Sequence, residues 1–250
     1  MLLWCSVLGL SVGDIVLLNY TIRVVEGGVE RVVDTTVESV ARSSGVYDPS
    51  RRYGEVVVVY GRSPLLKAVE EALAGMSVGE RREFIAPPEK AYGLRRDDLV
   101  VRVPVKQLNR LGVRVRVGEE VDLGGRRGVI SRVTERFAYI DFNHPLAGKT
   151  LKIELELVSK AESEADKAKL LAARLLGLNP TAVDASYDVS GKTVTVKLPA
   201  GILGLTDLEA RLQRIASDIY EAIKPRKLSY IIEIEYPAEE TSPQTQPPPS

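Results

Sequence analysis

The sequence is poor in the residues that bind metals or form cross-links. Of its 250 residues one is a cysteine, Cys5, and one is a histidine, His144. A single cysteine excludes an internal disulfide and a Cys-X-X-Cys pair, which fits a reducing compartment such as the cytoplasm. A single histidine excludes a multi-histidine metal site and limits any Ser-His-Asp triad to His144. We expect no metal and no cofactor. For His144, which precedes a proline in a predicted loop, we expect a structural hydrogen-bonding role.

The chain also lacks an excess of either charge. Lys and Arg together number 34, as do Asp and Glu, so the whole chain has no net attraction to nucleic acid or anionic lipid. Residues 1–10 are apolar, but this run is shorter than the roughly 20 residues that span a bilayer. It also has neither the positive start nor the cleavage site of a signal peptide. We expect a lead-in segment and no membrane association.

Alternation of apolar and polar residues is abundant in the first part of the sequence. Apolar side chains recur at every second position of residues 16–24, which predicts a strand with one buried face and places Tyr20 on that face. Gly27-Gly28 predicts a hairpin turn, after which a second strand reaches Asp34. Because Asp34 has the same parity as Val32, its carboxylate is predicted to point into an apolar interior. Burial of a carboxylate is costly in free energy unless the group is hydrogen-bonded or takes part in binding or catalysis.

Further elements complete the predicted sheet. The β-branched run Val56–Val59 predicts a strand, and Ser63-Pro64 predicts the start of a helix that ends at Gly75. Residues 76–86 predict a turn and another strand. Residues 151–157 alternate between apolar and charged side chains, which is typical of a half-buried antiparallel strand, and we assign them to the same sheet.

Residues 95–138 have a different composition. Short valine-rich runs at residues 101–105 and 113–117, separated by glycine turns, predict strands of a small β-rich domain. This segment contains 11 Lys or Arg and 6 Asp or Glu, so it is basic although the chain is not.

The remaining residues predict a second folded module, 159–237, followed by a tail. The module begins with a charged, alanine-rich helix, and two strands follow within residues 183–198. A capping-box pattern at Thr206–Glu209 starts a second helix, and a closing strand is expected at Tyr230–Tyr236. The order helix, strand, strand, helix, strand indicates an α+β module. Residues 238–250 contain too few apolar side chains to fold.

Five separated segments of the first half share the order and spacing of one known family. They are GDIVLLNYTI at 13–22, VVDTT at 32–36, LLKAVEEALAGMSVGE at 65–80, AYG at 91–93 and DFNHPLAGK at 141–149. Over about residues 12–158 the chain resembles the FKBP-type peptidyl-prolyl cis/trans isomerases, most closely the SlyD-like and archaeal long forms. The resemblance implies an α+β fold, an antiparallel FKBP-like sheet wrapped on a short helix, made of residues 1–94 and 139–158. It implies an inserted chaperone domain at 95–138.

The resemblance also assigns a site, an apolar pocket with one aspartate on its wall. It implies catalytic roles for Tyr20, Asp34 and Tyr92, with the Tyr92 hydroxyl as donor to a substrate carbonyl and Asp34 as the group that orients Tyr20. At four pocket positions this chain has valine where the family often has an aromatic ring. This implies a more aliphatic pocket and weak binding of macrolide inhibitors. The substrate-binding residues implied are Val33, Val56, Val58, Leu65, Leu66, Val69 and Ile153.

Such a site needs no nucleophile. Rotation about a peptide bond faces a barrier of about 18–20 kcal/mol because amide resonance is lost at the twisted geometry. A dry apolar pocket disfavours the planar, more polar form of the amide, and hydrogen bonds that fit only the twisted form add differential binding. The function that the resemblance implies is isomerisation of X-Pro bonds and chaperone action on unfolded or nascent chains in the cytoplasm.

Other hypotheses fit parts of the same sequence. Residues 118–133 resemble small SH3-like barrels that dock on ribosomal RNA, which would make this chain a ribosome-associated binding module. Val33 and Val69 in place of aromatic residues fit a catalytically weak isomerase fold that serves as a chaperone or adaptor. The valines of residues 95–138 form either the core of that domain or a surface for clients. For residues 159–237, the resemblance to long archaeal forms implies a homodimer interface.

Overall fold

The structure is a computed structural model, and it describes residues 9–234. The expectations for most of the apolar opening segment, with Cys5, and for the tail at 238–250 lie outside the described residues. The chain divides into two compact units, one up to Lys160 and one from Ala161 onward. Among the described helices, none is long and apolar enough to cross a membrane. The predicted α+β class, with antiparallel sheets and short helices, is confirmed.

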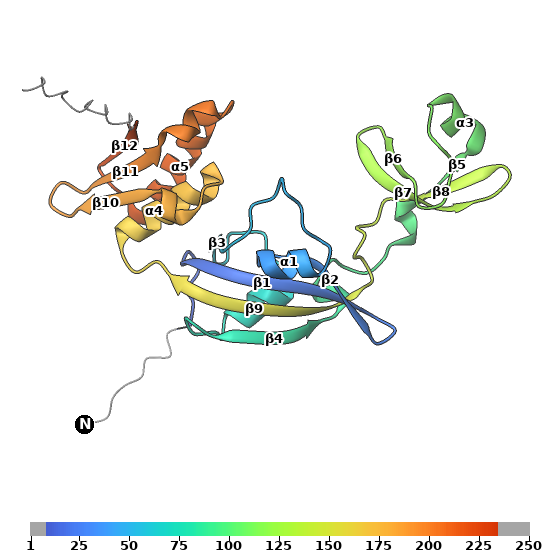
Figure 1. The fold of residues 1–250 in the computed structure, drawn as a ribbon, viewed down its shortest axis with the longest axis horizontal. Coiled ribbons are helices and arrows are strands. Elements are labelled where there is room, and N and C mark those ends of the chain that lie inside the picture. Colours follow the sequence, from blue (N-terminus) through green and yellow to red (C-terminus); the bar gives the residue numbers. More distant parts are fainter. Residues whose placement is uncertain (1–8, 235–250) are drawn as a thin grey trace, which may run out of the picture. The chain divides into compact units, whose positions relative to one another are not determined.

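The first unit contains a five-stranded antiparallel sheet, the main sheet, in which β1 and β9 are central (Figure 1). The strand order is β2-β1-β9-β4, and β3 pairs with the first residues of β1. Because β9 lies between β1 and β4, the last strand of this unit joins elements that precede it by more than sixty residues. The strands are β1 (Ile15–Glu26), β2 (Val29–Thr35), β3 (Val56–Val59), β4 (Arg81–Ala86) and β9 (Thr150–Lys160).

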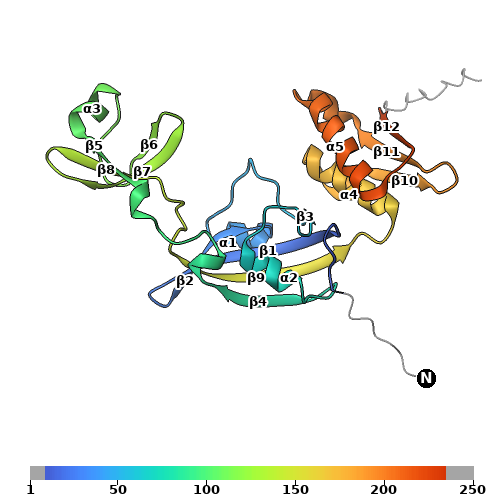
Figure 2. The ribbon, with the colours of Figure 1, turned by 180° about the vertical axis from the view of Figure 1, so that it is seen from behind.

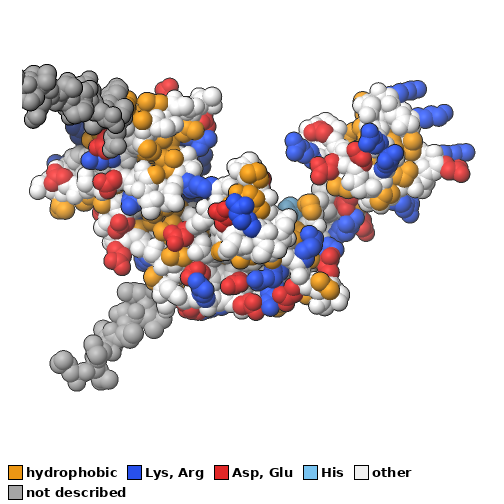
Figure 3. Space-filling model, in the orientation of Figure 1, with side chains coloured by type: hydrophobic (Ala, Val, Ile, Leu, Met, Phe, Trp, Pro, Cys, Tyr) orange, Lys and Arg blue, Asp and Glu red, His pale blue; other side chains and the backbone are white. Residues whose placement is uncertain are grey.

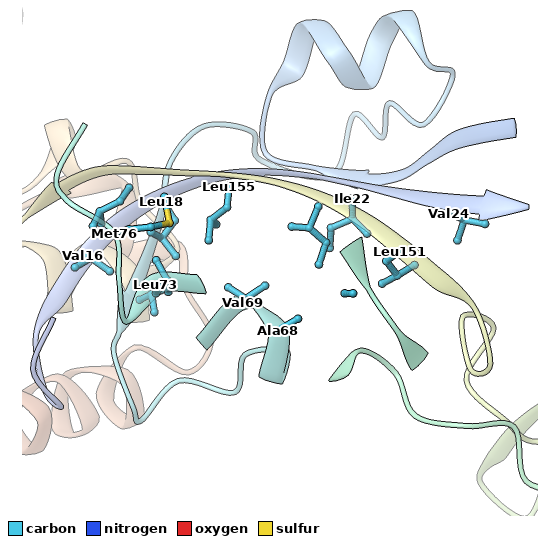
Figure 4. Close-up of a cluster of buried hydrophobic side chains, with 14 residues drawn as sticks. Val16, Leu18, Ile22, Val24, Ala68, Val69, Leu73, Met76, Leu151 and Leu155 are labelled. Atoms are coloured by element: carbon cyan, nitrogen blue, oxygen red, sulfur yellow. The ribbon is translucent and has the colours of Figure 1, made fainter. Parts of the chain in front are cut away.

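Two short helices cover opposite faces of the main sheet (Figures 1, 2 and 4). Helix α1 (Glu38–Ser43) lies on one face, and α2 (Lys67–Leu73) lies on the other. The alternation predicted for residues 16–24 is observed, since Val16, Leu18, Ile22 and Val24 belong to one buried cluster on the side of the sheet where α2 lies (Figure 4). Leu73 and Leu155 are at most 1% exposed in this core. Burial of such side chains contributes roughly 1.5–3 kcal/mol each.

Helix α2 begins later than the sequence predicts. The predicted capping residue, Ser63, is used elsewhere, because its hydroxyl oxygen accepts a hydrogen bond from the backbone N–H of Val59 at 2.9 Å. Ser63 therefore closes the turn that follows β3, and the chain remains extended to Leu66 before Lys67 starts the helix. Leu65 and Leu66, predicted on the helix, lie on the extended approach to it.

The segment between β4 and β9 forms a four-stranded sheet of its own, which we call the insert. Its strand order is β5-β8-β7-β6, and it has a separate core built around Leu108, Ile130 and Ile140. This sheet continues to Asp141, beyond the boundary predicted at residue 138. Its elements are β5 (Val100–Pro104), α3 (Val105–Arg110), β6 (Glu120–Leu123), β7 (Arg126–Val133) and β8 (Phe137–Asp141).

Two predictions for the insert are wrong. Residues 113–117 form no strand, because Val113 and Val115 pack on the core of the insert while the backbone N–H of Val113 bonds to the Leu108 carbonyl. Val113 and Val115 thus alternate with exposed arginines because they pack on this core, without a partner strand. Residue Val105, predicted in a strand, begins helix α3, because the preceding Pro104 ends the ladder with β8.

The second unit has the predicted order of helix, strand, strand, helix, strand. Its sheet has the order β10-β11-β12, in which β11 and β12 are parallel. Helix α4 begins at Glu164, where Ser163 and Asp166 form a capping box that the sequence analysis missed. The box predicted at Thr206 is absent, because the N-cap of helix α5 is Asp207, whose carboxylate accepts a hydrogen bond from Arg211 instead. The elements are α4 (Glu164–Leu176), β10 (Asp184–Asp188), β11 (Thr193–Pro199), α5 (Leu208–Ile223) and β12 (Lys227–Glu233).

The insert can be destabilised at one glycine. A Cβ atom at Gly128 would lie 2.8 Å from side-chain atoms of Ile140 and Phe142. We expect Gly128→Ala to destabilise the insert by roughly 1–3 kcal/mol, as overpacking of a core does. Amide hydrogen exchange within residues 100–141 would measure the loss. The control is Gly201→Ala, since a Cβ at Gly201 meets nothing within 4 Å; equal protection of the two variants would contradict the prediction.

Candidate functional site

Tyr20 lies at the middle of β1, on the face that packs with α2. Its ring is partly buried against the main core. Its backbone is fixed by the residue that follows β2, because the N–H of Tyr20 donates to the Thr36 hydroxyl at 2.9 Å and its carbonyl accepts from the N–H of Thr36 at 3.0 Å. The position of the ring therefore follows from strand pairing and leaves its hydroxyl at the edge of the core.

Asp34 reaches the same face through an irregularity in β2. In the pairing of β1 with β2, Asp34 is opposite Ile22 while Val32 is opposite Arg23, so Val33 is an extra residue. This bulge reverses the parity of the strand, as bulges do. Asp34 and Val32 therefore lie on opposite faces of the sheet. The sequence analysis predicted the correct face for Asp34, but its premise that Asp34 shares a face with Val32 was wrong. The Tyr20 hydroxyl donates to Asp34 Oδ2 at 3.0 Å.

The sequence analysis missed a third member of this group, Arg51. It lies in the loop between α1 and β3, and its guanidinium forms an ion pair with Asp34 Oδ1 and donates to the Tyr20 hydroxyl oxygen at 3.2 Å. The loop is connected to the residue that follows β2 by a hydrogen bond from the N–H of Gly54 to the Thr36 carbonyl at 2.8 Å. A loop arginine has no periodicity, so no pattern in the sequence indicated it.

Tyr92 lies after β4, in the irregular segment predicted for it. Its ring stacks on the His144 ring, with centroids 4.0 Å apart and planes at 4°. His144 is fixed in turn, because its Nδ1 accepts a hydrogen bond from the Leu146 N–H at 3.1 Å. Among the described residues the Tyr92 hydroxyl has no hydrogen-bond partner, so it is free to donate to a ligand. His144 thus accepts a hydrogen bond within its own loop and makes a stacking contact that was not foreseen.

All the apolar residues that the sequence analysis assigned to the site belong to the main core or pack on it. They differ in exposure, however. Ile153, Val58 and Val69 are 0%, 5% and 8% exposed, so these three support the site from within the core. The residues with accessible surface that a ligand could contact, besides Tyr20 and Tyr92, are Val33, Val56, Leu65 and Leu66. Phe84 and Leu146, which were not predicted, pack on the same core.

The electrostatics of the site keep its hydroxyls neutral. Burial, followed by the negative charge of Asp34 and the hydrogen bond to it, raises the pKa of Tyr20 to about 12. Burial also raises the pKa of Tyr92, and Asp34 adds to this effect, which shows that the carboxylate acts on both rings. Both phenols are therefore protonated donors at neutral pH. Across residues 9–234, no group of three or more metal-ligating side chains is placed to hold a metal ion.

Comparison with known proteins identifies a family. The model of the FKBP-type peptidyl-prolyl cis-trans isomerases matches residues 10–106. The chain is 36% identical, over 154 residues, to a short-type peptidyl-prolyl cis-trans isomerase of Methanocaldococcus jannaschii; the match covers 61% of this chain and 96% of that protein.

Two bacterial relatives are similar over shorter shares of their length. The chain is 35% identical over 157 residues to the FKBP-type isomerase SlyD of Aeromonas hydrophila, covering 60% of this chain and 65% of SlyD. It is 32% identical over 108 residues to SlyD of Escherichia coli, covering 42% of this chain and 55% of SlyD.

The pKa of Tyr20 provides a test of the site geometry. We expect Asp34→Asn to lower this pKa toward its ordinary value, but not fully, because burial remains the largest cause of the increase. Arg51→Gln should raise it further, because Arg51 lowers it. Titration of ring-labelled tyrosines by NMR would measure both changes. Tyr230, whose pKa of about 12 comes from burial alone, is an internal control that neither substitution should move.

The same pKa has a consequence for stability. Because the folded pKa of Tyr20 lies above its ordinary 10.0, folding favours the protonated phenol. This contribution to the free energy of unfolding is complete below pH 10 and is lost as the pH rises through about 12. An unchanged Tyr20 pKa in Asp34→Asn would contradict the arrangement described here.

Proposed function

This chain belongs to the FKBP-type peptidyl-prolyl cis-trans isomerases, and we propose that it isomerises X-Pro bonds of unfolded or nascent polypeptides at the surface formed by Tyr20, Asp34 and Tyr92. The observation that supports this most directly is the convergence of these residues, from segments far apart in the chain, on one apolar core. The single cysteine fits action in the reducing cytoplasm.

The proline ring would contact the exposed parts of the valines and leucines at the site. There the amide leaves water, which disfavours its planar, charge-separated form relative to the twisted form. The barrier of about 18–20 kcal/mol is lowered to the extent that the twisted amide is bound more tightly than either planar isomer. The free hydroxyl of Tyr92 is the donor best placed to bind a substrate carbonyl in that geometry.

The roles of Tyr20, Asp34 and Arg51 are different. The Tyr20 hydroxyl already donates to Asp34, so Tyr20 presents its ring edge to the substrate rather than its proton. Arg51 pairs with Asp34 and offsets much of its charge near the apolar surface. We assign Asp34 and Arg51 to positioning, because they hold the Tyr20 ring and shape the local field.

The insert supports the chaperone part of this proposal through its apolar surface. Val101, Leu111 and Val117 are 40%, 60% and 66% exposed, although the insert has its own core. Exposed apolar side chains are a typical surface for extended, unfolded chains. A client held there would be presented to the catalytic site at a raised effective concentration, because both sites are in one chain.

The catalytic roles can be tested with proline peptides. We expect Tyr92→Phe to lower kcat/KM by about three- to tenfold, the equivalent of one neutral hydrogen bond. Asp34→Ala should lower it by roughly ten- to a hundredfold, because it frees Tyr20 and leaves Arg51 unpaired. A protease-coupled assay on a short prolyl peptide measures both. Tyr220→Phe, at a site 62% exposed in the second unit, is the control and should have no effect. Full activity of both site variants would refute the assignment.

The role of the insert can be tested separately. We expect the triple variant Val101→Ser, Leu111→Ser, Val117→Ser to retain activity on a short peptide but to lose most of its acceleration of proline-limited protein refolding. The reason is that only a long client contacts both surfaces. The matched control replaces three exposed valines elsewhere, Val29, Val78 and Val189, with serine. Equal refolding rates with the two triple variants would exclude the insert as the client surface.

A further inference from the structure

The insert has a large number of cationic side chains without anionic partners. Between residues 100 and 137 the sequence has nine Lys or Arg and four Asp or Glu. All nine are exposed, and none of them makes an ion pair with another residue of the described chain. Figure 3 shows Lys and Arg side chains gathered over this part of the molecule. Elsewhere in the first unit, by contrast, arginines such as Arg23 and Arg81 are paired with glutamates.

Two of these arginines lie on aromatic rings of one sheet face. In the register of β5 with β8, Arg102 is opposite Tyr139, and in that of β7 with β8, Arg132 is also opposite Tyr139. The guanidinium of Arg132 lies 4.0 Å from the centre of the Tyr139 ring, and that of Arg102 lies 4.5 Å from the centre of the Phe137 ring.

This face is not the one that builds the core of the insert. Along β8, Ala138 and Ile140 are buried in that core, and the alternate residues Phe137 and Tyr139 are partly exposed. The two rings are two residues apart on one strand, or about 6.6 Å along it. They form, with Arg102 and Arg132 on either side, an outward surface of rings flanked by planar cations, which we call the ring face.

Such a surface has the properties of a platform for unpaired bases. Aromatic rings and guanidinium planes both stack on bases, and unpaired arginines attract a phosphate backbone. An acidic peptide would satisfy the charge but would make no use of flat rings. A duplex would satisfy the charge but keeps its base faces stacked inside. We infer that the ring face of the insert binds single-stranded RNA, an interaction independent of the proposed isomerase function.

The test is binding of the full-length chain to a labelled oligouridine of about 12 nucleotides, a length within the roughly 4–16 nucleotides that one OB fold covers. Fluorescence anisotropy at several salt concentrations gives both the affinity and its salt dependence. The first variant is Arg102→Ala with Arg132→Ala. The second is Arg102→Lys with Arg132→Lys, which retains the charge and removes the planar groups. The control is Arg31→Ala with Arg214→Ala, which removes the same charge from exposed positions elsewhere.

We expect the alanine variant to bind at least tenfold more weakly than the wild type, and the control to bind as the wild type does. The salt slope of log K should fall by roughly 1.4 in the alanine variant, at about 0.7 for each lost phosphate contact. The lysine variant should keep the wild-type slope but lose about threefold or more in affinity, since stacking is lost and charge is not.

Several results would overturn the inference. They are an alanine variant that binds like the control, a duplex RNA that binds as tightly as the single strand, and a polyglutamate peptide that displaces the RNA at equal charge concentration. The last of these would assign the face to an acidic protein instead. Unchanged amide protection within residues 100–141 shows that the insert of each variant is folded, and unchanged activity on a short prolyl peptide shows that the main sheet is, so a failure here is distinct from a failure of the catalytic assignment.

Discussion

The hydrogen bond from the Tyr20 hydroxyl to Asp34 allows a carboxylate to lie at the rim of an apolar core. A charge moved out of water is costly unless it is paired and hydrogen-bonded. Asp34 is satisfied by Tyr20 and by Arg51, and Tyr20 is held through its backbone by Thr36. The proposed catalytic surface therefore depends on a small polar group whose members are fixed by strand β1, by the bulge in β2 and by the following loop. Removal of one member leaves another with a charge that has lost its ion-pair partner or with a hydroxyl that has lost its hydrogen-bond partner.

The regular parts of this arrangement could be predicted from the sequence because each depends on a period. Alternation along β1 and β9 follows directly from burial of one sheet face, so the pattern alone places Tyr20 and Ile153 on the core side. The α+β order of the second unit followed from the same kind of pattern. Tyr92 and Asp34 were indicated by family motifs, which preserve spacing even where no period exists.

The irregular parts could not be predicted in this way. A bulge changes the parity of every later residue in its strand, so the direction of Asp34 depended on an extra residue that composition does not mark. Arg51 lies in a loop, and its partner is 17 residues away. Helix starts were predicted wrongly where a capping side chain had another partner, as with Ser63, whose hydroxyl accepts from the backbone N–H of Val59 at the end of β3. In each case a contact between separated residues decided the outcome, and local pattern contains no information on such contacts.

The central place of β9 in the main sheet has a consequence for how the protein is made. β9 is the last strand of the first unit, yet it fills the gap between β1 and β4 and makes the most extensive pairing of the sheet. During synthesis on the ribosome, the four strands of the insert emerge before β9 does. The insert can therefore fold while the main sheet still lacks its middle strand and exposes open edges. The growing chain thus completes the insert first and the main sheet only when residue 160 has left the exit tunnel.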